Sequence, residues 1–176
     1  MPWYGSHPYL NEYIREGNCR RIMEIGVYDG ENALTMVGAA AQNFPPEEVE
    51  YYGFDLFPYH SPTEIKRKLA ETGCRFTLYE GNSIETLAEA VTSLPEMDLI
   101  FIDGGKSYSV AVSDWENCTQ LIHEGTGVFV HNADFPGVRR MVEGIPLDEY
   151  EVRIFHAPSE GSVAQIQKKR NERDGS

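Results

Sequence analysis

The sequence predicts an α/β protein, a single doubly wound Rossmann-like domain with a mostly parallel seven-stranded sheet and an antiparallel edge strand. Three observations predict this fold. Short apolar runs of strand length alternate with segments of helical spacing, which is typical of repeated βα units. The first apolar run leads into a turn that contains Gly26 and Gly30, and a helix follows. Polar side chains come at or just after the strand ends, where open α/β sheets bind ligands.

The elements follow from local signals along the chain. Helices are expected over 7–16, 30–42, 62–72, 83–94, 108–122 and 135–143, and Gly17, Pro45 and Gly73 lie where the first three should end. Strands are expected over 20–25, 49–55, 75–80, 97–103, 127–131, 150–156 and 162–167. The run 97–103 is almost continuously apolar, as a buried parallel strand should be. The last two strands are separated by a short turn, which predicts a hairpin.

Length and composition limit the classes of protein that fit. The 176 residues favour one domain over 1–176, with an N-terminal helical and aromatic cap over 1–17 and a polar tail over 168–176. A formal net charge of −13 argues against a nucleic-acid partner, because phosphate contacts require Lys and Arg. The three cysteines form no CxxC pair, so reduced thiols in a cytoplasmic protein are expected. No apolar run reaches membrane-spanning length, and no signal peptide is recognisable.

The glycine turn and the second strand predict a nucleoside cofactor. The motif is Glu24-x-Gly26-x-x-x-Gly30, which lacks the close glycine spacing of dinucleotide-binding turns. An acid two residues before the first glycine would repel a pyrophosphate but could pair with an ammonium group. Asp55, at the end of the second strand, is placed to accept both hydroxyls of a ribose. A cofactor with an amino-acid end and a ribose, S-adenosylmethionine (SAM), fits better than a nicotinamide dinucleotide, which stays a weaker alternative.

From about Pro8 to Gln167, the chain resembles the class I SAM-dependent methyltransferases. It is similar to small bacterial members with a Glu-Ile-Gly-x-x-x-Gly first motif and an Ile-Asp-Gly-Gly fourth motif. The resemblance implies that Glu24, Gly26 and Gly30 contact the methionine end of the cofactor, and that Asp55 holds the ribose. It also implies that Asn82 and Ser83 contact the adenine and that Asp103 lies beneath the sulfonium. Tyr28 lies inside the glycine turn and could also contact the cofactor, whereas Asn82 could equally cap the following helix.

A second resemblance concerns the catalytic residues. The segment Asp103-Gly-Gly-Lys106 and the pair His131-Asn132 are similar to the metal-dependent catechol O-methyltransferases. In that family an Asp and a later Asp-Asn pair hold Mg²⁺, and a Lys three residues after the first Asp acts as the base. Asp103, Lys106 and Asn132 match this pattern, but His131 stands where the family has Asp. Imidazole suits Mn²⁺, Fe²⁺, Co²⁺ or Zn²⁺ better than Mg²⁺.

Three interpretations of these residues stay open. In the first, Asp103, His131 and Asn132 bind a divalent ion and Lys106 accepts the proton. In the second, no metal binds and His131 is the general base, with Asp103 orienting it. In the third, Lys106 and His131 only form hydrogen bonds or face solvent. A histidine base has an ordinary pKa near neutral pH, so His131 could accept the proton without help. Lys106 could do so only if its pKa were depressed.

The function that these expectations favour is SAM-dependent methylation of a small molecule, most simply at a hydroxyl group. The alternatives are a metal-free methyltransferase acting on nitrogen, sulfur or carbon, and a SAM-binding protein without transfer activity. The chain has almost no insertions beyond the expected core. The substrate pocket is therefore expected to be shallow or completed by a second subunit in a homodimer.

Overall fold

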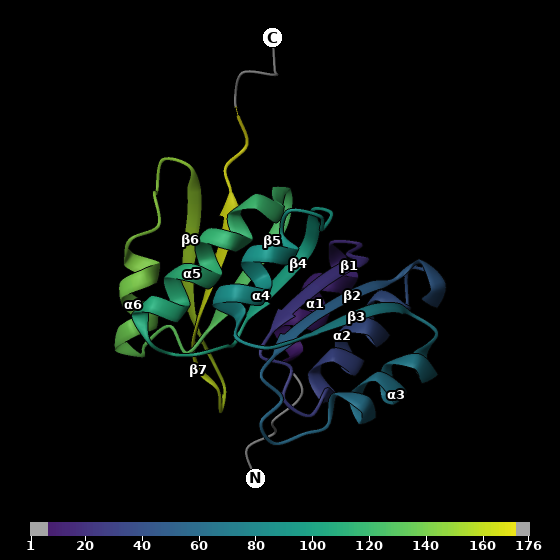
Figure 1. The fold of residues 1–176 in the computed structure, drawn as a ribbon. Helices are drawn as coiled ribbons and strands as arrows, with labels where there is room; N and C mark the ends of the chain where they lie inside the picture. Colours follow the sequence, from purple (N-terminus) through teal and green to yellow (C-terminus); the bar gives the residue numbers. More distant parts are fainter. Residues whose placement is uncertain (1–6, 172–176) are drawn as a thin grey trace.

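The computed structural model describes residues 7–171, which form one seven-stranded sheet with helices on both faces (Figure 1). The strands are β1 (Arg21–Ile25), β2 (Glu50–Asp55), β3 (Arg75–Glu80), β4 (Met97–Ile102), β5 (Ile122–His131), β6 (Tyr150–Ala157) and β7 (Gly161–Lys168). The helices are α1 (Pro8–Glu16), α2 (Glu31–Ala40), α3 (Pro62–Thr72), α4 (Ser83–Ala90), α5 (Tyr108–Cys118) and α6 (Pro136–Glu143), with short 3₁₀ turns at Pro46–Glu48 and Thr119–Leu121.

The strand order is β3-β2-β1-β4-β5-β7-β6, and the first five of these strands are parallel. The predicted mostly parallel seven-stranded sheet with antiparallel pairing at the edge is confirmed. In detail, the antiparallel strand β7 pairs with β5, and β6 forms the edge beyond it. The chain reverses direction across the sheet between β1 and β4, which makes the carboxyl ends of these two strands the topological switch point.

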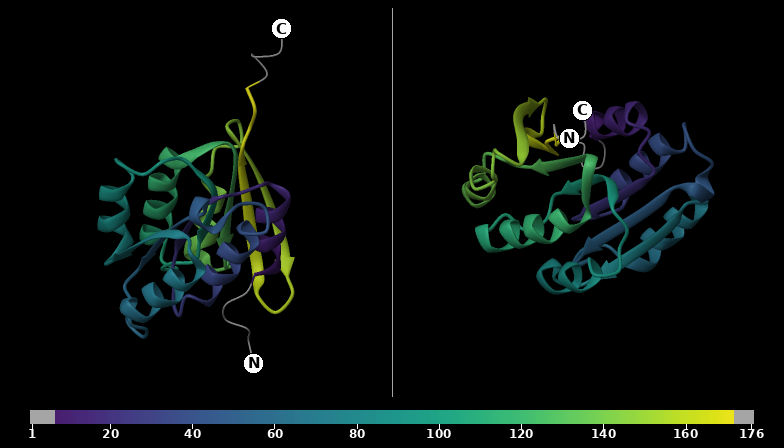
Figure 2. Two further views of the ribbon diagram at one scale, coloured as in Figure 1. Left: turned by 90° about the vertical axis from the view of Figure 1, so that its right-hand side faces the viewer. Right: turned by 90° about the horizontal axis from the view of Figure 1, so that it is seen from above.

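Two apolar cores lie on opposite faces of the sheet. Helices α1, α2 and α3 cover one face, and α4, α5 and α6 cover the other (Figure 2). Side chains alternate between the faces along each strand, so that Met23 and Ile25 face one core while Ile22 faces the other. Each strand is therefore held from both sides, and the ends of β1 and β4 have fixed positions.

Several predicted boundaries are wrong, for local reasons. The helix that begins at Ser83 ends at Ala90 rather than Leu94, because a turn follows. Ile122, which was expected on a helix face, is the first residue of β5, since Thr119–Leu121 forms a separate 3₁₀ turn. The expected polar tail begins later than residue 168, because β7 includes Lys168 and the Lys169 amide donates to the Glu149 carbonyl, 2.9 Å away. The expected cap keeps its helix α1, but its residues 1–6 lie outside the described part of the chain, as do 172–176 of the tail.

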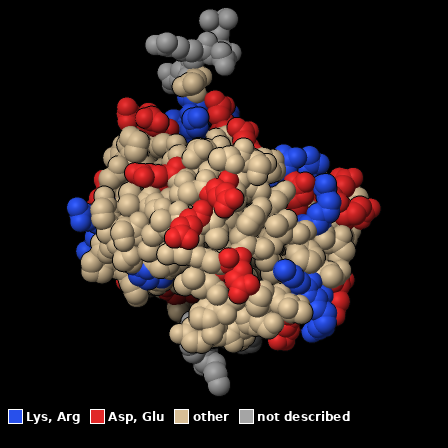
Figure 3. Space-filling view, viewed as in Figure 1, with Lys and Arg blue, Asp and Glu red and all other residues tan. Residues whose placement is uncertain are grey.

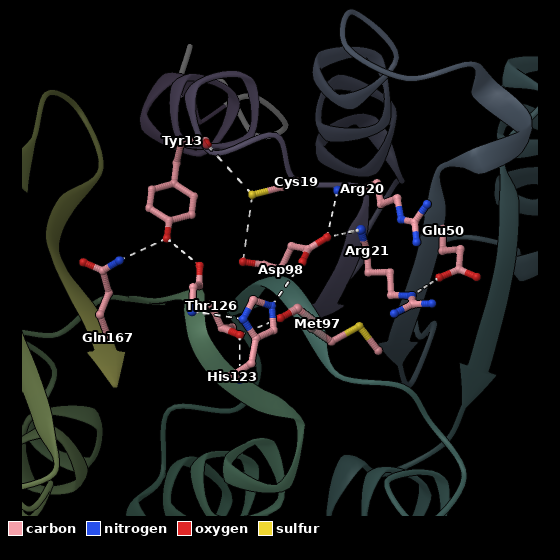
Figure 4. A network of polar contacts seen from close by, with 11 residues as sticks. Tyr13, Cys19, Arg20, Arg21, Glu50, Met97, Asp98, His123, Thr126 and Gln167 are labelled. Atoms are coloured by element: carbon pink, nitrogen blue, oxygen red, sulfur yellow. Dashed lines mark hydrogen bonds and ion pairs between the residues drawn. The ribbon is translucent and has the colours of Figure 1, made fainter. Parts of the chain in front are cut away.

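A polar network fixes the amino-terminal edge of the parallel strands (Figure 4). Asp98 Oδ2 accepts hydrogen bonds from the backbone amides of Arg20 and Arg21, each at 2.9 Å, and Asp98 Oδ1 lies 3.1 Å from His123 Nε2. Thr126 donates to the Met97 carbonyl at 2.6 Å. These contacts join the starts of β1, β4 and β5 at the end of the sheet opposite the predicted site.

The surface agrees with the acidic composition. The face in Figure 3 carries acidic side chains near its centre, and Lys and Arg side chains lie toward its rim, so the described residues form no broad basic area on this face. Within residues 7–171, no helix has both the length and the apolar character needed to cross a membrane. Cys19, Cys74 and Cys118 are buried free thiols.

Candidate active site

The glycine turn brings the ends of β1 and β4 into direct backbone contact. Gly26 has φ +94°, and its amide donates to the Phe54 carbonyl at 2.8 Å. A Cβ atom at this position would lie 2.2 Å from the Asp103 carbonyl oxygen. Only glycine fits here, because any side chain would collide with the backbone that follows β4. Gly30, with φ +81°, is the N-cap of α2 and completes the turn.

Asp55 ties the end of β2 to this turn. Its Oδ2 atom accepts hydrogen bonds from the amides of Val27 at 2.7 Å and Tyr28 at 2.8 Å, and its Oδ1 atom accepts one from Phe57 at 2.7 Å. Each carboxylate oxygen has two lone pairs, so acceptor capacity for a ribose hydroxyl is left. Tyr28 is half exposed, and its ring lies edge-on to His60, with 4.6 Å between the ring centroids. Asp55 thus fixes the glycine turn against the end of β2.

Glu24 lies in the core rather than in the open part of the site. Its carboxyl group is 1% exposed and receives hydrogen bonds from Asn32 Nδ2 at 2.7 Å and from the Tyr51 hydroxyl at 2.5 Å. Burial raises its pKa to about 8, although both hydrogen bonds oppose the rise. From the sequence, Glu24 was expected beside the ammonium group of the cofactor. In the structure, strand alternation turns the Glu24 side chain toward α2 instead. In this structure Glu24 holds the first turn of α2 against β1 and β2.

Asn82 and Ser83 begin α4 beside the site. Asn82 is the N-cap, and its Oδ1 atom accepts from the Ile84 amide at 3.1 Å, which is the capping alternative that the sequence left open. Ser83 lies near Asp114 of α5, a fully buried acid that the sequence reasoning missed. Burial raises the pKa of Asp114 to about 6, and the Ser83 hydroxyl and the charge of Lys106 oppose this rise. The signal available in the sequence was an acid beside Trp115 on the buried face of a helix.

The three predicted catalytic side chains meet at the end of β4. Asp103 Oδ1 lies 2.7 Å from Lys106 Nζ and 3.0 Å from His131 Nδ1. Burial by itself would raise the pKa of Asp103, but the His131 hydrogen bond and the Lys106 charge outweigh it and hold the pKa below its usual range. An ionised carboxylate only accepts hydrogen bonds, so His131 Nδ1 is the donor. The lone pair of the neutral imidazole is then on Nε2, which is buried and has no hydrogen-bond partner among the described residues.

The metal site predicted from Asp103, His131 and Asn132 stays a prediction, and each of these residues contacts another group of the protein. His131 presents an N–H to Asp103, so an ion between the two side chains would have to displace this hydrogen bond. The Lys106 ammonium group already neutralises the same carboxylate oxygen. Asn132 follows in the left-handed region, with φ +55°, and its carbonyl accepts from the Phe135 amide at 3.0 Å in the turn before α6. A carboxylate–ammonium–imidazole cluster is what these residues form.

Comparison with known proteins agrees with the fold and the motifs. A family described as a methyltransferase domain matches residues 23–133. Comparison with curated protein sequences gives no match.

Solved structures of similar fold include the apo form of CalS11, a TDP-rhamnose 3'-O-methyltransferase of calicheamicin biosynthesis. It has a TM-score of 0.77 and 20% identity over 91% of this chain and 77% of that one. The O-methyltransferase TomG from Streptomyces achromogenes, in complex with SAM, has a TM-score of 0.75 and 18% identity over 95% of this chain and 82% of TomG. An O-methyltransferase from Bacillus cereus, in complex with SAH, has a TM-score of 0.75 and 16% identity over 96% of this chain and 84% of that one. These structures share the fold, and the family match includes the glycine turn, Asp55 and the Asp103–Lys106–His131 cluster; the chain therefore belongs to the methyltransferase-domain family.

Proposed function

We propose that this protein is a SAM-dependent methyltransferase that methylates a hydroxyl group of a small molecule. The observation that supports this proposal most strongly is the position of Asp103. It follows β4 at the switch point, its backbone contacts Gly26, and its carboxylate holds both Lys106 and His131. A cofactor cradle and a proton-handling cluster are thus adjacent at the carboxyl edge of the sheet.

The residues divide into a binding group and a reacting group. The Gly26–Gly30 turn and Asp55 would hold the amino-acid end and the ribose, and the start of α4 at Asn82 and Ser83 would border the adenine. When bound, SAM supplies an electrophilic methyl group on its sulfonium. The described helices and strands are those of the core fold, which favours a small acceptor. A cytoplasmic location and a homodimer that completes the pocket belong to the same proposal.

His131 is the proton acceptor in this proposal. The acceptor oxygen forms a bond to the methyl carbon as the carbon–sulfur bond breaks, and the hydroxyl proton passes to His131 Nε2. Asp103 keeps the lone pair on Nε2 and stabilises the imidazolium that results. Lys106 keeps Asp103 ionised and in place, since its ammonium group contacts the same carboxylate oxygen. The alternative in which Lys106 is the base requires Lys106 to lose its proton while it is paired with a carboxylate.

The direct test is the formation of SAH from SAM with a panel of phenols, catechols and sugar hydroxyls. We expect at least one acceptor to be methylated on oxygen, and we expect His131→Gln to slow the reaction by about 100- to 10,000-fold. The matched control is His123→Gln, since His123 also pairs with an Asp but lies at the opposite edge of the sheet. SAM binding without turnover of any acceptor would instead support a binding protein without transfer activity. Methylation only of nitrogen, sulfur or carbon acceptors would contradict the hydroxyl assignment.

A further inference from the structure

We propose that His7, His131 and Glu160 form a binding site for a divalent transition-metal ion. The three residues come from separate parts of the chain, namely the N-cap of α1, the end of β5 and the turn between β6 and β7. In Figure 1, the β6–β7 turn lies at the carboxyl end of the parallel strands. One ligand atom from each residue lies within 4.8 Å of the other two. Neither His7 nor Glu160 belongs to the cluster described above.

The three side chains are already close to a ligand geometry. His7 Nδ1 lies 2.7 Å from Glu160 Oε2, and the centroids of the His7 and His131 rings are 5.3 Å apart. Ligand atoms around a tetrahedral Zn²⁺ are about 3.4 Å apart, given metal–ligand distances near 2.1 Å. Closing the site around an ion would therefore bring the most distant ligand atoms about 1.4 Å closer, and it would open the 2.7 Å contact between His7 and Glu160 by about 0.7 Å, so that the ion replaces that hydrogen bond.

The strongest evidence for a ligand is the Nε2 atom of His131. It is buried and has no hydrogen-bond partner among residues 7–171, although a polar atom in this position is normally satisfied. Its ring is fixed by the hydrogen bond from Nδ1 to Asp103, which leaves the Nε2 lone pair directed away from that carboxylate. The other ring nitrogen of a metal-binding His almost always donates to a carboxylate, a backbone carbonyl or a water. The Asp103–His131 pair thus has the outer-sphere arrangement of a metal ligand.

The surroundings shield the site from water. Only 10% of the His7 side chain and 15% of the Glu160 and His131 side chains are exposed. The ring of His7 packs against Phe101, with 4.8 Å between centroids, and the Tyr9 hydroxyl lies 3.3 Å from His7 Nδ1. The set offers two imidazoles and the Glu160 carboxylate as ligands, and the Asp103 carboxylate, which is paired with Lys106, lies behind His131.

The ligand types select the ion. Imidazole nitrogen suits Zn²⁺, Co²⁺, Fe²⁺ and Mn²⁺, whereas Mg²⁺ and Ca²⁺ prefer oxygen ligands. Three protein ligands leave a fourth tetrahedral position for water or for an oxygen of a bound molecule, as in catalytic zinc sites. Binding requires neither SAM nor an acceptor, so this site goes beyond the proposed function. In the metal-loaded protein His131 Nε2 is a ligand, and its role as proton acceptor belongs to the metal-free protein.

The test uses untagged full-length protein that has been stripped of metal with a chelator. Calorimetric titration with Zn²⁺ should show one ion bound per chain, and titration with Mg²⁺ over the same range should show none. His7→Asn and Glu160→Gln should each raise the Zn²⁺ dissociation constant by more than about tenfold. His123→Asn, in the His–carboxylate pair at the opposite edge, should leave it unchanged. No saturable Zn²⁺ binding, or binding that these two variants leave intact and Asn132→Ala removes, would overturn the proposal.

Two further measurements separate metal binding from folding and from cofactor binding. Co²⁺ added to the wild-type protein should give the visible absorption bands of a four-coordinate ion with nitrogen ligands, and their absence would contradict the site without any variant. Zn²⁺ should raise the melting temperature of the wild type but not of His7→Asn. SAH binding by His7→Asn should match the wild type. A loss of Zn²⁺ binding with SAH binding retained is thus distinguishable from a failure of the methyltransferase proposal.

Discussion

His131 Nδ1 lies 3.0 Å from Asp103 Oδ1, so the end of β5 donates a hydrogen bond to the carboxylate that follows β4. Lys106 Nζ contacts the same oxygen at 2.7 Å. The Asp103 carboxylate therefore has two partners that can be tested separately. Its hydrogen bond with His131 fixes the tautomer of the imidazole, whereas Lys106 supplies a positive charge.

We expect Asp103→Asn to reduce the rate of methyl transfer far more than Lys106→Met does. The amide can present an N–H to His131 and favour the wrong tautomer, whereas Lys106→Met leaves the Asp103–His131 hydrogen bond in place. The loss in Asp103→Asn should be about 100- to 10,000-fold, as for a lost general base. SAH formation under saturating SAM measures both effects. A Lys106→Met variant as inactive as Asp103→Asn would show that Lys106 is the base.

Gly26→Ala should destabilise the protein and weaken SAH binding. The new Cβ would meet the Asp103 carbonyl oxygen at 2.2 Å, and φ is +94°. We expect the free energy of unfolding in urea to fall by at least about 1–3 kcal/mol. Gly38→Ala is the matched control, because no atom lies within 4 Å of its Cβ position on α2. It should raise stability by about 0.5–1 kcal/mol. Equal stabilities of the two variants would contradict the close approach of β1 and β4.

Glu24 should make the protein less stable as the pH rises. Its folded-state pKa of about 8 exceeds the ordinary value of 4.5, so the folded state binds more protons than the unfolded state between these values. Its contribution is complete below about pH 4.5 and is lost as the pH rises through about 8. The slope from this group is at most about 1.4 kcal/mol per pH unit. Urea unfolding across this pH window should show that the free energy of unfolding declines less steeply with pH in Glu24→Gln than in the wild type. Identical slopes would show that a group other than Glu24 causes the pH dependence.

The strand ends could be predicted from the sequence, because each follows an apolar run and the carboxyl ends of parallel strands share one edge. This reasoning placed Gly26, Asp55, Asp103 and His131 correctly relative to the sheet. It could not place Glu24, because the direction of a strand side chain depends on which helix covers that face.

The contacts of the N-terminal helix with the last hairpin were beyond sequence reasoning. His7 and Glu160 are 153 residues apart, and neither belongs to a recognisable motif. Only the packing of α1 beside β5 and β7 brings them together. The start of β5 was also missed, because residues 119–122 keep helical spacing although the helix ends at Cys118.

The measurement that tests the central claim most directly is calorimetric titration of the purified protein with SAH. We expect saturable binding at one site per chain. Asp55→Ala should abolish it, because Asp55 holds the turn at Val27 and Tyr28 and can accept one further hydrogen bond, from a ribose hydroxyl, on Oδ1. Asp148→Asn, an exposed acid outside the site, should bind as the wild type does. No SAH binding by the wild type, or equal binding by Asp55→Ala, would contradict the assignment of this edge of the sheet as a SAM site.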